Sequence, residues 1–255
     1  MQFVTRLFFS LFILISVSAC VPYAEVSHSS VAPITPMSRQ IVLQRVSAVI
    51  VTDRQNLSGW YNKNFNSSNA PGDADGGSAA PITADGYFLT ADHVLSRIAG
   101  RNVFVLYGKG GSLTPFKARV VWRDAASDLA LLHIDEKTPF FYQWSPPTQH
   151  AGAGTPIIHG GISTGFRTDE GKLETAVPSE SRFSGSRRFK MNLPLQPGDS
   201  GGPVVDGYGR LIGINSAVEF LVPMETAFFI DSEGNRPNVS KLGSVIQRDR
   251  LEKSR

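Results

Sequence analysis

One serine in this chain sits in a setting that favours nucleophilic chemistry, the string Gly198-Asp199-Ser200-Gly201-Gly202-Pro203. Glycine adopts backbone angles that other residues avoid, and it lets a second backbone approach closely. A nucleophilic serine needs such surroundings, because the groups that stabilise an oxyanion are backbone N–H groups beside it. Two valines, the turn 206–209 and a second apolar pair follow, which predicts a β-hairpin. An ordinary Gly-rich turn is the alternative, and partners elsewhere in the chain decide between the two.

His93 is the candidate for the base that such a serine requires. Upstream of it, Asp85-Gly86 separates two apolar runs and predicts a hairpin turn. The second run ends in Thr-Ala-Asp-His, which places His93 at the end of a strand, just before a short helical turn. A lone histidine is more often structural, so its assignment as a base depends on Ser200.

Asp128 is the carboxylate that can orient this histidine. It opens an apolar strand, so its side chain would be sheltered at the mouth of the core and could accept the imidazole N–H. The competing carboxylate Asp124 is assigned to a turn, and His133, inside the strand, is assigned a structural role. A catalytic triad of Ser200, His93 and Asp128 is defined by convergence in space, because chain order differs between unrelated folds.

A second serine, Ser163, lies in Gly161-Ile162-Ser163-Thr164-Gly165, which fits the nucleophile motif G-x-S-x-G of a different hydrolase fold. In that fold the catalytic histidine follows the serine in the chain. The five histidines, at positions 28, 93, 133, 150 and 159, all precede Ser163. Chain order therefore excludes Ser163 as a nucleophile, and we assign its segment to a loop between strands.

Composition limits the possible partners and cross-links. The 255 residues suit one globular unit of about 200 residues. Their formal charge is +3, or +2 without residues 1–19, which is too even a balance to favour nucleic acid. The basic run Arg187-Arg188-Phe189-Lys190 is assigned to a solvated loop. A single cysteine, Cys20, excludes an intramolecular disulfide and a zinc site built on cysteine pairs. We expect neither a metal nor a cofactor.

The first 19 residues have the proportions of a secretory signal peptide. Residues 7–17 are apolar, but a helix needs about 20 residues to span a bilayer. Val17-Ser18-Ala19-Cys20 resembles the lipobox of bacterial lipoproteins, in which the cysteine becomes the lipidated N-terminus. Val21 rather than Asp follows, which by this resemblance implies the outer membrane, facing the periplasm. The alternative is a plain secretory signal. Residues 20–37 are predicted to form a tether between this anchored end and the folded domain.

Most of the folded body reads as strands. Short strands are predicted at residues 41–43, 46–51, 103–107 and 116–122, besides those named above. Residues 52–77 are polar and rich in Asn, Ser, Gly and Asp, which indicates a long exposed loop. From Asn238 to Ile246, apolar residues at spacings of three and four predict a closing helix.

These segments together resemble a chymotrypsin-fold (trypsin-like) serine protease, and specifically the bacterial high-temperature-requirement (Deg-type) branch. The resemblance is carried by Thr83–Val94, Arg123–Asp135, Gly198–Pro203, Gly213–Ala217 and Ala227–Ile230. It implies an all-β fold of two six-stranded antiparallel β-barrels with a short C-terminal helix. The expected division is 1–19 signal peptide, 20–37 tether, 38–237 protease domain and 238–255 helix and tail.

The resemblance also implies an activity, the hydrolysis of peptide bonds through an acyl-enzyme. Ser200 would be the nucleophile, His93 the base and Asp128 the orienting acid, with the N–H groups of Gly198 and Ser200 as the oxyanion hole. The expected partners are a polypeptide substrate and, through the lipid on Cys20, a membrane of the bacterial cell envelope. The expected substrate-binding residues, which would add the substrate as a strand, are Asn215, Ser216 and Ala217.

Two features depart from the resembled family. Asp199 stands where these enzymes usually have Asn; in the digestive type this aspartate binds an α-amino group released by cleavage. An acylated Cys20 would supply no such amine, so we expect Asp199 to be solvated or paired with Arg187 or Arg188. Only nine residues follow Ile246, too few for the PDZ domain that commonly follows.

Specificity and resting activity are open at this point. Six positions before the serine, where trypsin-like enzymes would carry an aspartate, this chain has Pro194, and residues 193–196 include no acid. We therefore expect cleavage after a small or medium apolar residue rather than after Lys or Arg. The alternatives are a catalytically silent peptide-binding protein of the same fold, a latent protease whose loop 195–198 orders only with a ligand, and a structural lipoprotein.

Overall fold

The computed structural model describes residues 32–57, 73–109, 112–146, 151–163, 168–177, 186–221 and 228–254. The predicted signal peptide and lipidation site lie outside these ranges, as do most of the tether and much of the predicted loop 52–77. No helix within the described ranges combines the length and the apolar character that crossing a membrane requires.

Six strands of the N-terminal half close into a barrel, in the order β1-β2-β3-β6-β5-β4, with antiparallel neighbours. On β1, Val49 and Val51 face the apolar interior, whereas Ala48 and Ile50 belong to a second cluster. A slip of one residue would exchange these two faces, so burial fixes the register. The strands are β1 (Ser47–Thr52), β2 (Ala74–Pro81), β3 (Tyr87–Thr90), β4 (Asn102–Lys109), β5 (Ser112–Asp124) and β6 (Leu129–His133).

Six strands of the C-terminal half form a second antiparallel sheet, in the order β8-β7-β10-β11-β12-β9. A bridge between Leu173 and Met191 joins its two edges, so the sheet curls into a half-barrel. The predicted all-β double-barrel architecture is confirmed, with the second barrel less completely closed than the first. The strands are β7 (Pro156–Gly160), β8 (Thr168–Lys172), β9 (Ser186–Met191), β10 (Pro203–Asp206), β11 (Leu211–Leu221) and β12 (Phe228–Pro237).

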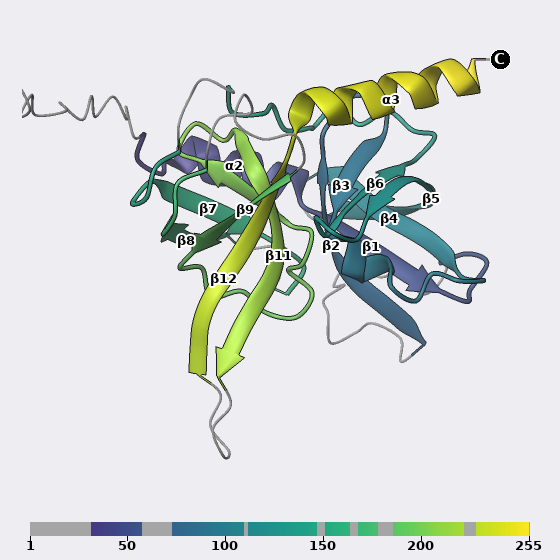
Figure 1. The fold of residues 1–255 in the computed structure, drawn as a ribbon. Coiled ribbons are helices and arrows are strands. Elements are labelled where there is room, and N and C mark those ends of the chain that lie inside the picture. The colour runs from purple at the N-terminus through teal and green to yellow at the C-terminus, as the bar shows by residue number, and fades with distance from the viewer. Residues whose placement is uncertain are drawn as a thin grey trace, which may run out of the picture. The chain divides into compact units, whose positions relative to one another are not determined.

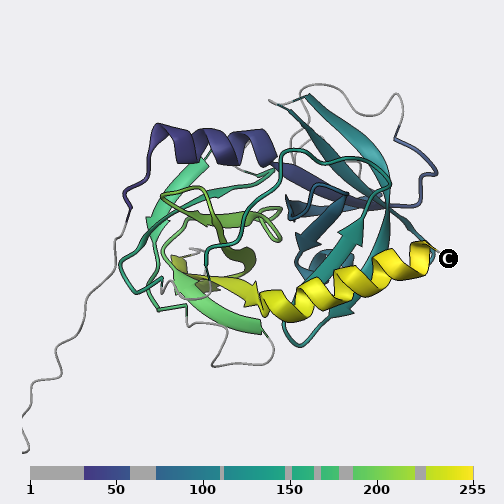
Figure 2. The same ribbon diagram turned by 90° about the horizontal axis from the view of Figure 1, so that it is seen from above.

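A shared apolar cluster packs the two barrels against each other. Leu89 and Leu131 of the first barrel contact this cluster from one side, and Val205 and Ile214 of the second contribute from the other. The C-terminal helix α3 (Val239–Lys253) adds Leu242 to the same cluster and runs along the first barrel (Figures 1 and 2). The positions of residues from different barrels are therefore held by one continuous core.

Ion pairs and a hydroxyl hold α3 on the first barrel. Both nitrogens of the Arg119 fork donate to Asp249, at 2.8 and 2.7 Å, and the buried Tyr87 hydroxyl donates to the same carboxylate at 2.8 Å. One turn of the helix thus satisfies a buried phenol that would otherwise lack an acceptor. The predicted closing helix is confirmed and extends beyond Ile246 to Lys253.

The prediction of a strand at residues 41–43 is wrong, because this segment lies in the helix α2 (Pro36–Arg45). Thr35 caps the helix by accepting from the backbone N–H of Ser38, whose side chain accepts in return, and Pro36 occupies the first turn. These capping signals outweigh the strand preference of Ile41 and Val42. The helix includes two residues of the predicted tether, and β2 likewise begins inside the predicted loop.

Candidate active site

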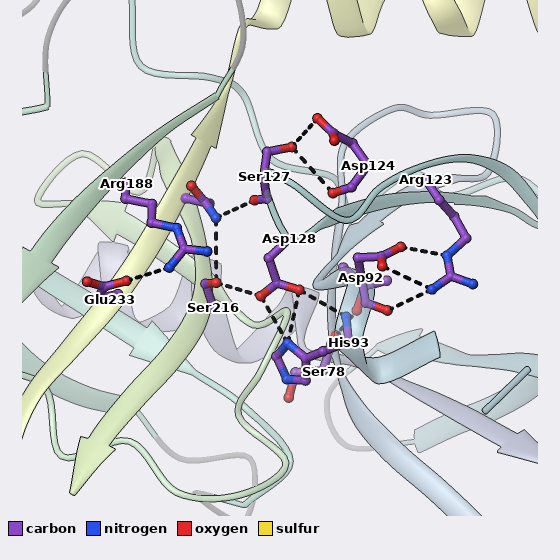
Figure 3. Close-up of polar contacts among 12 residues, drawn as sticks. Ser78, Asp92, His93, Arg123, Asp124, Ser127, Asp128, Arg188, Ser216 and Glu233 are labelled. Carbon is purple, nitrogen blue, oxygen red and sulfur yellow. Dashed lines mark hydrogen bonds and ion pairs between the residues drawn. The ribbon is translucent and has the colours of Figure 1, made fainter. Parts of the chain in front are cut away.

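His93 and Asp128 meet at the edge of the first barrel. His93 follows β3 in the short 3-10 helix η2 (Asp92–Leu95). Its Nδ1 lies 2.9 Å from Oδ2 of Asp128, and its backbone N–H donates to Oδ1 at 2.9 Å (Figure 3). Because Nδ1 donates to the carboxylate, Nε2 keeps its lone pair and can accept a proton. The histidine side chain is 49% exposed, so this nitrogen is within reach of a substrate.

Asp128 holds its carboxylate in place by an unusual backbone conformation and by three donors. Its φ of 50° lies in the left-handed region, which aspartate tolerates better than most residues and which no other non-glycine residue of the described ranges adopts. Besides the two donors of His93, the Ser216 hydroxyl donates to Oδ2 at 2.5 Å. The side chain is only 13% exposed. Ser216 comes from β11, so the second barrel contributes to orienting the acid.

This arrangement raises the pKa of His93 and lowers the pKa of Asp128, and both shifts favour the charged forms of the two side chains. The hydrogen bond to Asp128 raises the pKa of His93, and it outweighs the opposing effect of partial burial. Burial raises the pKa of Asp128, but the hydrogen bonds from His93 and Ser216 together hold that pKa below its usual range. A carboxylate beside an imidazole that becomes protonated is the electrostatic arrangement that a general base requires.

Two further acids near this pair have structural roles. Asp92, 6% exposed, binds the Arg123 guanidinium, whose Nε lies 2.5 Å from Oδ1, and this pair fixes η2 against β5. Asp124 accepts from the Ser127 hydroxyl and from the N–H of Ala126, and Figure 3 shows it turned away from His93. Asp124 is the last residue of β5, so it borders the turn 125–128 and does not lie within it as the sequence predicted.

Ser200 lies beside the segment that carries His93. Its carbonyl accepts from the N–H of Ser78 at 2.8 Å. A Cβ placed on Gly77 would lie 2.6 Å from the Val94 side chain and 3.0 Å from the Ser200 carbonyl, so these two groups are neighbours. The serine is half-buried. No hydrogen bond joins its hydroxyl to the His93 ring within the described ranges.

The residues before Ser200 form a tight turn, 196–199, which we call the oxyanion turn. Asp199 N–H donates to Gln196 C=O at 2.9 Å, and Gly198 has a φ of +102°. Every carbonyl from 196 to 200 accepts a hydrogen bond. The N–H groups of Gly198 and Ser200, in contrast, have no acceptor among the residues that the structure describes. Two unused donors beside a serine are the parts of an oxyanion-binding site.

The structure contradicts the expected solvation of Asp199 and its expected pairing with Arg188, whereas the side chain of Arg187 lies outside the described part of the chain. The Asp199 side chain is fully buried rather than solvated, and its neighbour is His159, whose Nε2 lies 3.6 Å from Oδ1. Arg188 instead pairs with Glu233 at 3.0 Å, as Figure 3 shows. The aspartate points inward, towards β7, and not towards Arg188 of β9.

The expected substrate-binding residues differ in what they offer. Asn215 and Ser216 are 1% and 2% exposed, and their side chains contact His159 and Asp128 instead of facing solvent. Their backbone could still pair with a substrate strand. Beyond Asn215, the described partner strand of β11 lies only on its β12 side, because pairing with β10 stops at Ile214 and Pro203. The orienting role of Ser216 had no signal in the sequence.

The family model for the trypsin-like peptidase domain matches residues 77–214, just over half of the chain, and the chain belongs to this family. A probable periplasmic serine endoprotease DegP-like from Pseudomonas fluorescens is 29% identical over 195 residues, which cover 67% of this chain and 38% of that protein. A serine protease Do-like HtrA from Lactobacillus helveticus is 31% identical over 137 residues, 51% of this chain and 32% of that protein. The chain thus spans well under half the length of these relatives.

Solved structures of HtrA-type proteases share the fold. AlgW with a tripeptide superposes with a TM-score of 0.58 at 21% identity, covering 83% of this chain and 63% of that one. Deg5 superposes with a TM-score of 0.53 at 19% identity, covering 71% and 83%. The double-barrel architecture of this chain is therefore that of the HtrA-type proteases.

The hydrogen bond between His93 and Asp128 makes a prediction about titration. Replacing the carboxylate by an amide, Asp128→Asn, removes the group that favours imidazolium, so the pKa of His93 should fall. NMR titration of the His93 ring in a Ser200→Ala background measures this directly. Asp124→Asn is the matched control and should leave the ring unchanged. Equal titration curves for the two variants would contradict the assignment of Asp128.

Proposed function

We propose that this chain is a serine endopeptidase, which hydrolyses peptide bonds through an acyl-enzyme at Ser200. The observation that carries the proposal is the hydrogen bond from His93 to a sheltered Asp128, near Ser200. The N–H groups of Ser200 itself and of Gly198 have no acceptor in the part of the chain that the structure describes. Membership of the trypsin-like peptidase family supports the same chemistry.

In the proposed mechanism, Ser200 Oγ attacks the scissile carbonyl while Nε2 of His93 takes its proton. The imidazolium, stabilised by Asp128, then protonates the leaving amine. The N–H groups of Gly198 and Ser200 bind the oxyanion, and losing one such donor typically costs about 10²–10³ in rate. Hydrogen bonds between a serine and its base are often long without substrate and tighten on binding, so their absence here is compatible with catalysis.

We propose a polypeptide substrate that pairs with β11 as an added strand. The backbone of residues 216–218 is available on the side away from β12, next to the oxyanion turn. An extended peptide placed there would bring one carbonyl to Ser200. The AlgW structures were solved with a tripeptide and a decapeptide, which supports this class of ligand.

The alternative is a latent or catalytically silent peptide-binding protein of the same fold. The hydrogen bond between His93 and Asp128, together with the N–H groups of Gly198 and Ser200 that no described residue accepts from, favours an active enzyme over both forms. A covalent probe distinguishes them, because only a competent serine and base react with it.

The first test is covalent labelling with a fluorophosphonate. The wild-type chain should be labelled and should hydrolyse an unstructured polypeptide, whereas Ser200→Ala should lose labelling and about 10⁶-fold in kcat. Ser244→Ala, which changes an exposed serine of α3, is the matched control and should behave as wild type. A folded wild-type chain that stays unlabelled would refute the proposal.

The second test concerns the residue before the scissile bond. Because residues 193–196 contain no acid, peptides with Ala or Val at this position should be cleaved at least about tenfold faster than peptides with Arg or Lys. The kcat/KM values of a peptide series that varies only this residue measure the preference. A strong preference for Arg would show that another carboxylate lines the pocket.

We further propose that Cys20 is lipidated and anchors the protein in the cell envelope, at the outer membrane and facing the periplasm. The sequence of residues 17–20 supports this, as does the description of several relatives as periplasmic. In a bacterial host, the wild-type chain should partition with membranes and incorporate an alkyne-labelled fatty acid. Cys20→Ser should remove both properties, and Ser200→Ala should retain them. Membrane partitioning of Cys20→Ser without label would point to another attachment.

A further inference from the structure

We propose that Ser163 is a positioning residue for the oxyanion turn, acting together with the buried pair of Asp199 and His159. Its hydroxyl holds the Pro197–Gly198 peptide in the orientation that leaves the Gly198 N–H available to an oxyanion. This inference rests on the proposed peptidase function. It assigns a role to the serine that chain order excludes as a nucleophile.

The function proposed for the oxyanion turn depends on the orientation of its central peptide, Pro197–Gly198. Pro197 and Gly198 occupy the two central positions of a turn closed by the Asp199 N–H and the Gln196 carbonyl. The φ of +102° at Gly198 defines a type II turn, whereas a type I turn needs a negative φ there. The two types differ by a rotation of the central peptide, which exchanges the sides of its C=O and N–H. The type of turn therefore decides whether the N–H or the C=O of the Pro197–Gly198 peptide faces a bound oxyanion.

Ser163 contacts the central peptide of this turn. Its hydroxyl donates to the Pro197 carbonyl, and this contact is made only when that carbonyl points towards the segment after β7. The Gly198 N–H belongs to the same planar peptide and must then point the opposite way. A Cβ on residue 198 would lie 2.3 Å from the Ser163 Oγ, so the contact also requires glycine there.

The buried carboxylate of Asp199 places Ser163 beneath the turn. Oδ1 accepts from the Ser163 N–H at 3.2 Å, and Oδ2 accepts from the Gln196 N–H at 3.0 Å. One side chain thus ties the start of the turn to the backbone of Ser163. A Cβ on Gly161 would lie 2.3 Å from Oδ1, so a glycine at this position leaves the room that the carboxylate occupies.

His159 supplies the buried counterpart that this carboxylate needs. Both side chains are fully buried, Nε2 faces Asp199 Oδ1 at 3.6 Å, and Nδ1 lies 3.2 Å from the Pro203 carbonyl. The ring thus lies between the Asp199 carboxylate, the Pro203 carbonyl and the side-chain amide of Asn215, whose Nδ2 lies 2.6 Å from Nδ1. A buried carboxylate without a partner would be costly. Asp199 and His159 thus contribute side chains of the second barrel to the support of the oxyanion turn.

Ser78 completes the restraint from the first barrel. Its hydroxyl accepts from the Ile162 N–H at 3.0 Å and donates to the Gly198 carbonyl at 2.8 Å. The segment that carries Ser163 and the turn that it contacts are thereby attached to the same buried side chain. The two serines contact different peptides. The Ser163 hydroxyl binds the carbonyl of the Pro197–Gly198 peptide, which carries the Gly198 N–H, whereas the Ser78 hydroxyl binds the carbonyl of the next peptide.

Replacement of the Ser163 hydroxyl tests the inference. Ser163→Ala should lower kcat by about 10–100-fold, less than the full loss of one oxyanion donor, and should slow fluorophosphonate labelling to a similar degree. KM for a peptide substrate should stay within about twofold, because the hydroxyl does not contact substrate. Ser163→Thr, which keeps a hydroxyl, should restore most of the rate. Thermal unfolding midpoints of both variants establish that they fold.

A second readout is independent of catalysis. In a Ser200→Ala background, Ser163→Ala should shift the Gly198 amide resonance in ¹H–¹⁵N NMR spectra, and Ser163→Thr should shift it less. An unchanged resonance would overturn the inference even if the chain had no activity. Wild-type kcat and labelling in Ser163→Ala would overturn it while leaving the proposed function intact. A rise in KM alone would also overturn it, since that outcome indicates contact with substrate. An unlabelled wild-type chain would instead refute the proposed function.

Discussion

The hydrogen bond between His93 and Asp128 is the interaction on which the candidate site depends, and it depends in turn on the contact between the two barrels. The imidazole and the carboxylate both belong to the first barrel, but the carboxylate is also bound by Ser216 of the second. Ser200 is likewise tied to β2 through Ser78. The apolar cluster shared by the barrels keeps these groups in register, because a close-packed core resists small displacements.

A second constraint concerns backbone groups rather than side chains. Every carbonyl of the oxyanion turn accepts a hydrogen bond, whereas the N–H groups of Gly198 and of the following Ser200 have no acceptor within the described ranges. Backbone groups in a folded protein are nearly always paired. A stretch whose acceptors are all satisfied, but which keeps two unused N–H donors, therefore offers a binding site for an anion. The surrounding side chains, Ser78, Ser163 and Asp199, produce this asymmetry by binding the carbonyls and the other N–H groups.

Several features were predictable because they are encoded locally. The Gly198–Pro203 string, the strand before His93 and the apolar strand after Asp128 each place a residue at the end of a strand or in a turn. The helix α2 could also have been predicted from its Thr-Pro cap, but the β-branched residues Ile41 and Val42 suggested a strand. That error arose from weighing propensity above capping, although propensity is the weaker signal when a helix packs against a core.

The class of fold, the candidate nucleophile, base and acid, and the exclusion of Ser163 as a nucleophile could all be predicted, because they follow from local patterns and chain order. The partner of Asp199 and the contacts of Ser163 and Ser216 could not be predicted in this way. These side chains meet groups that are tens of residues away, across strands whose pairing no local pattern specifies. Side-chain direction decides such contacts, and it is fixed by packing in three dimensions rather than by neighbours in the chain.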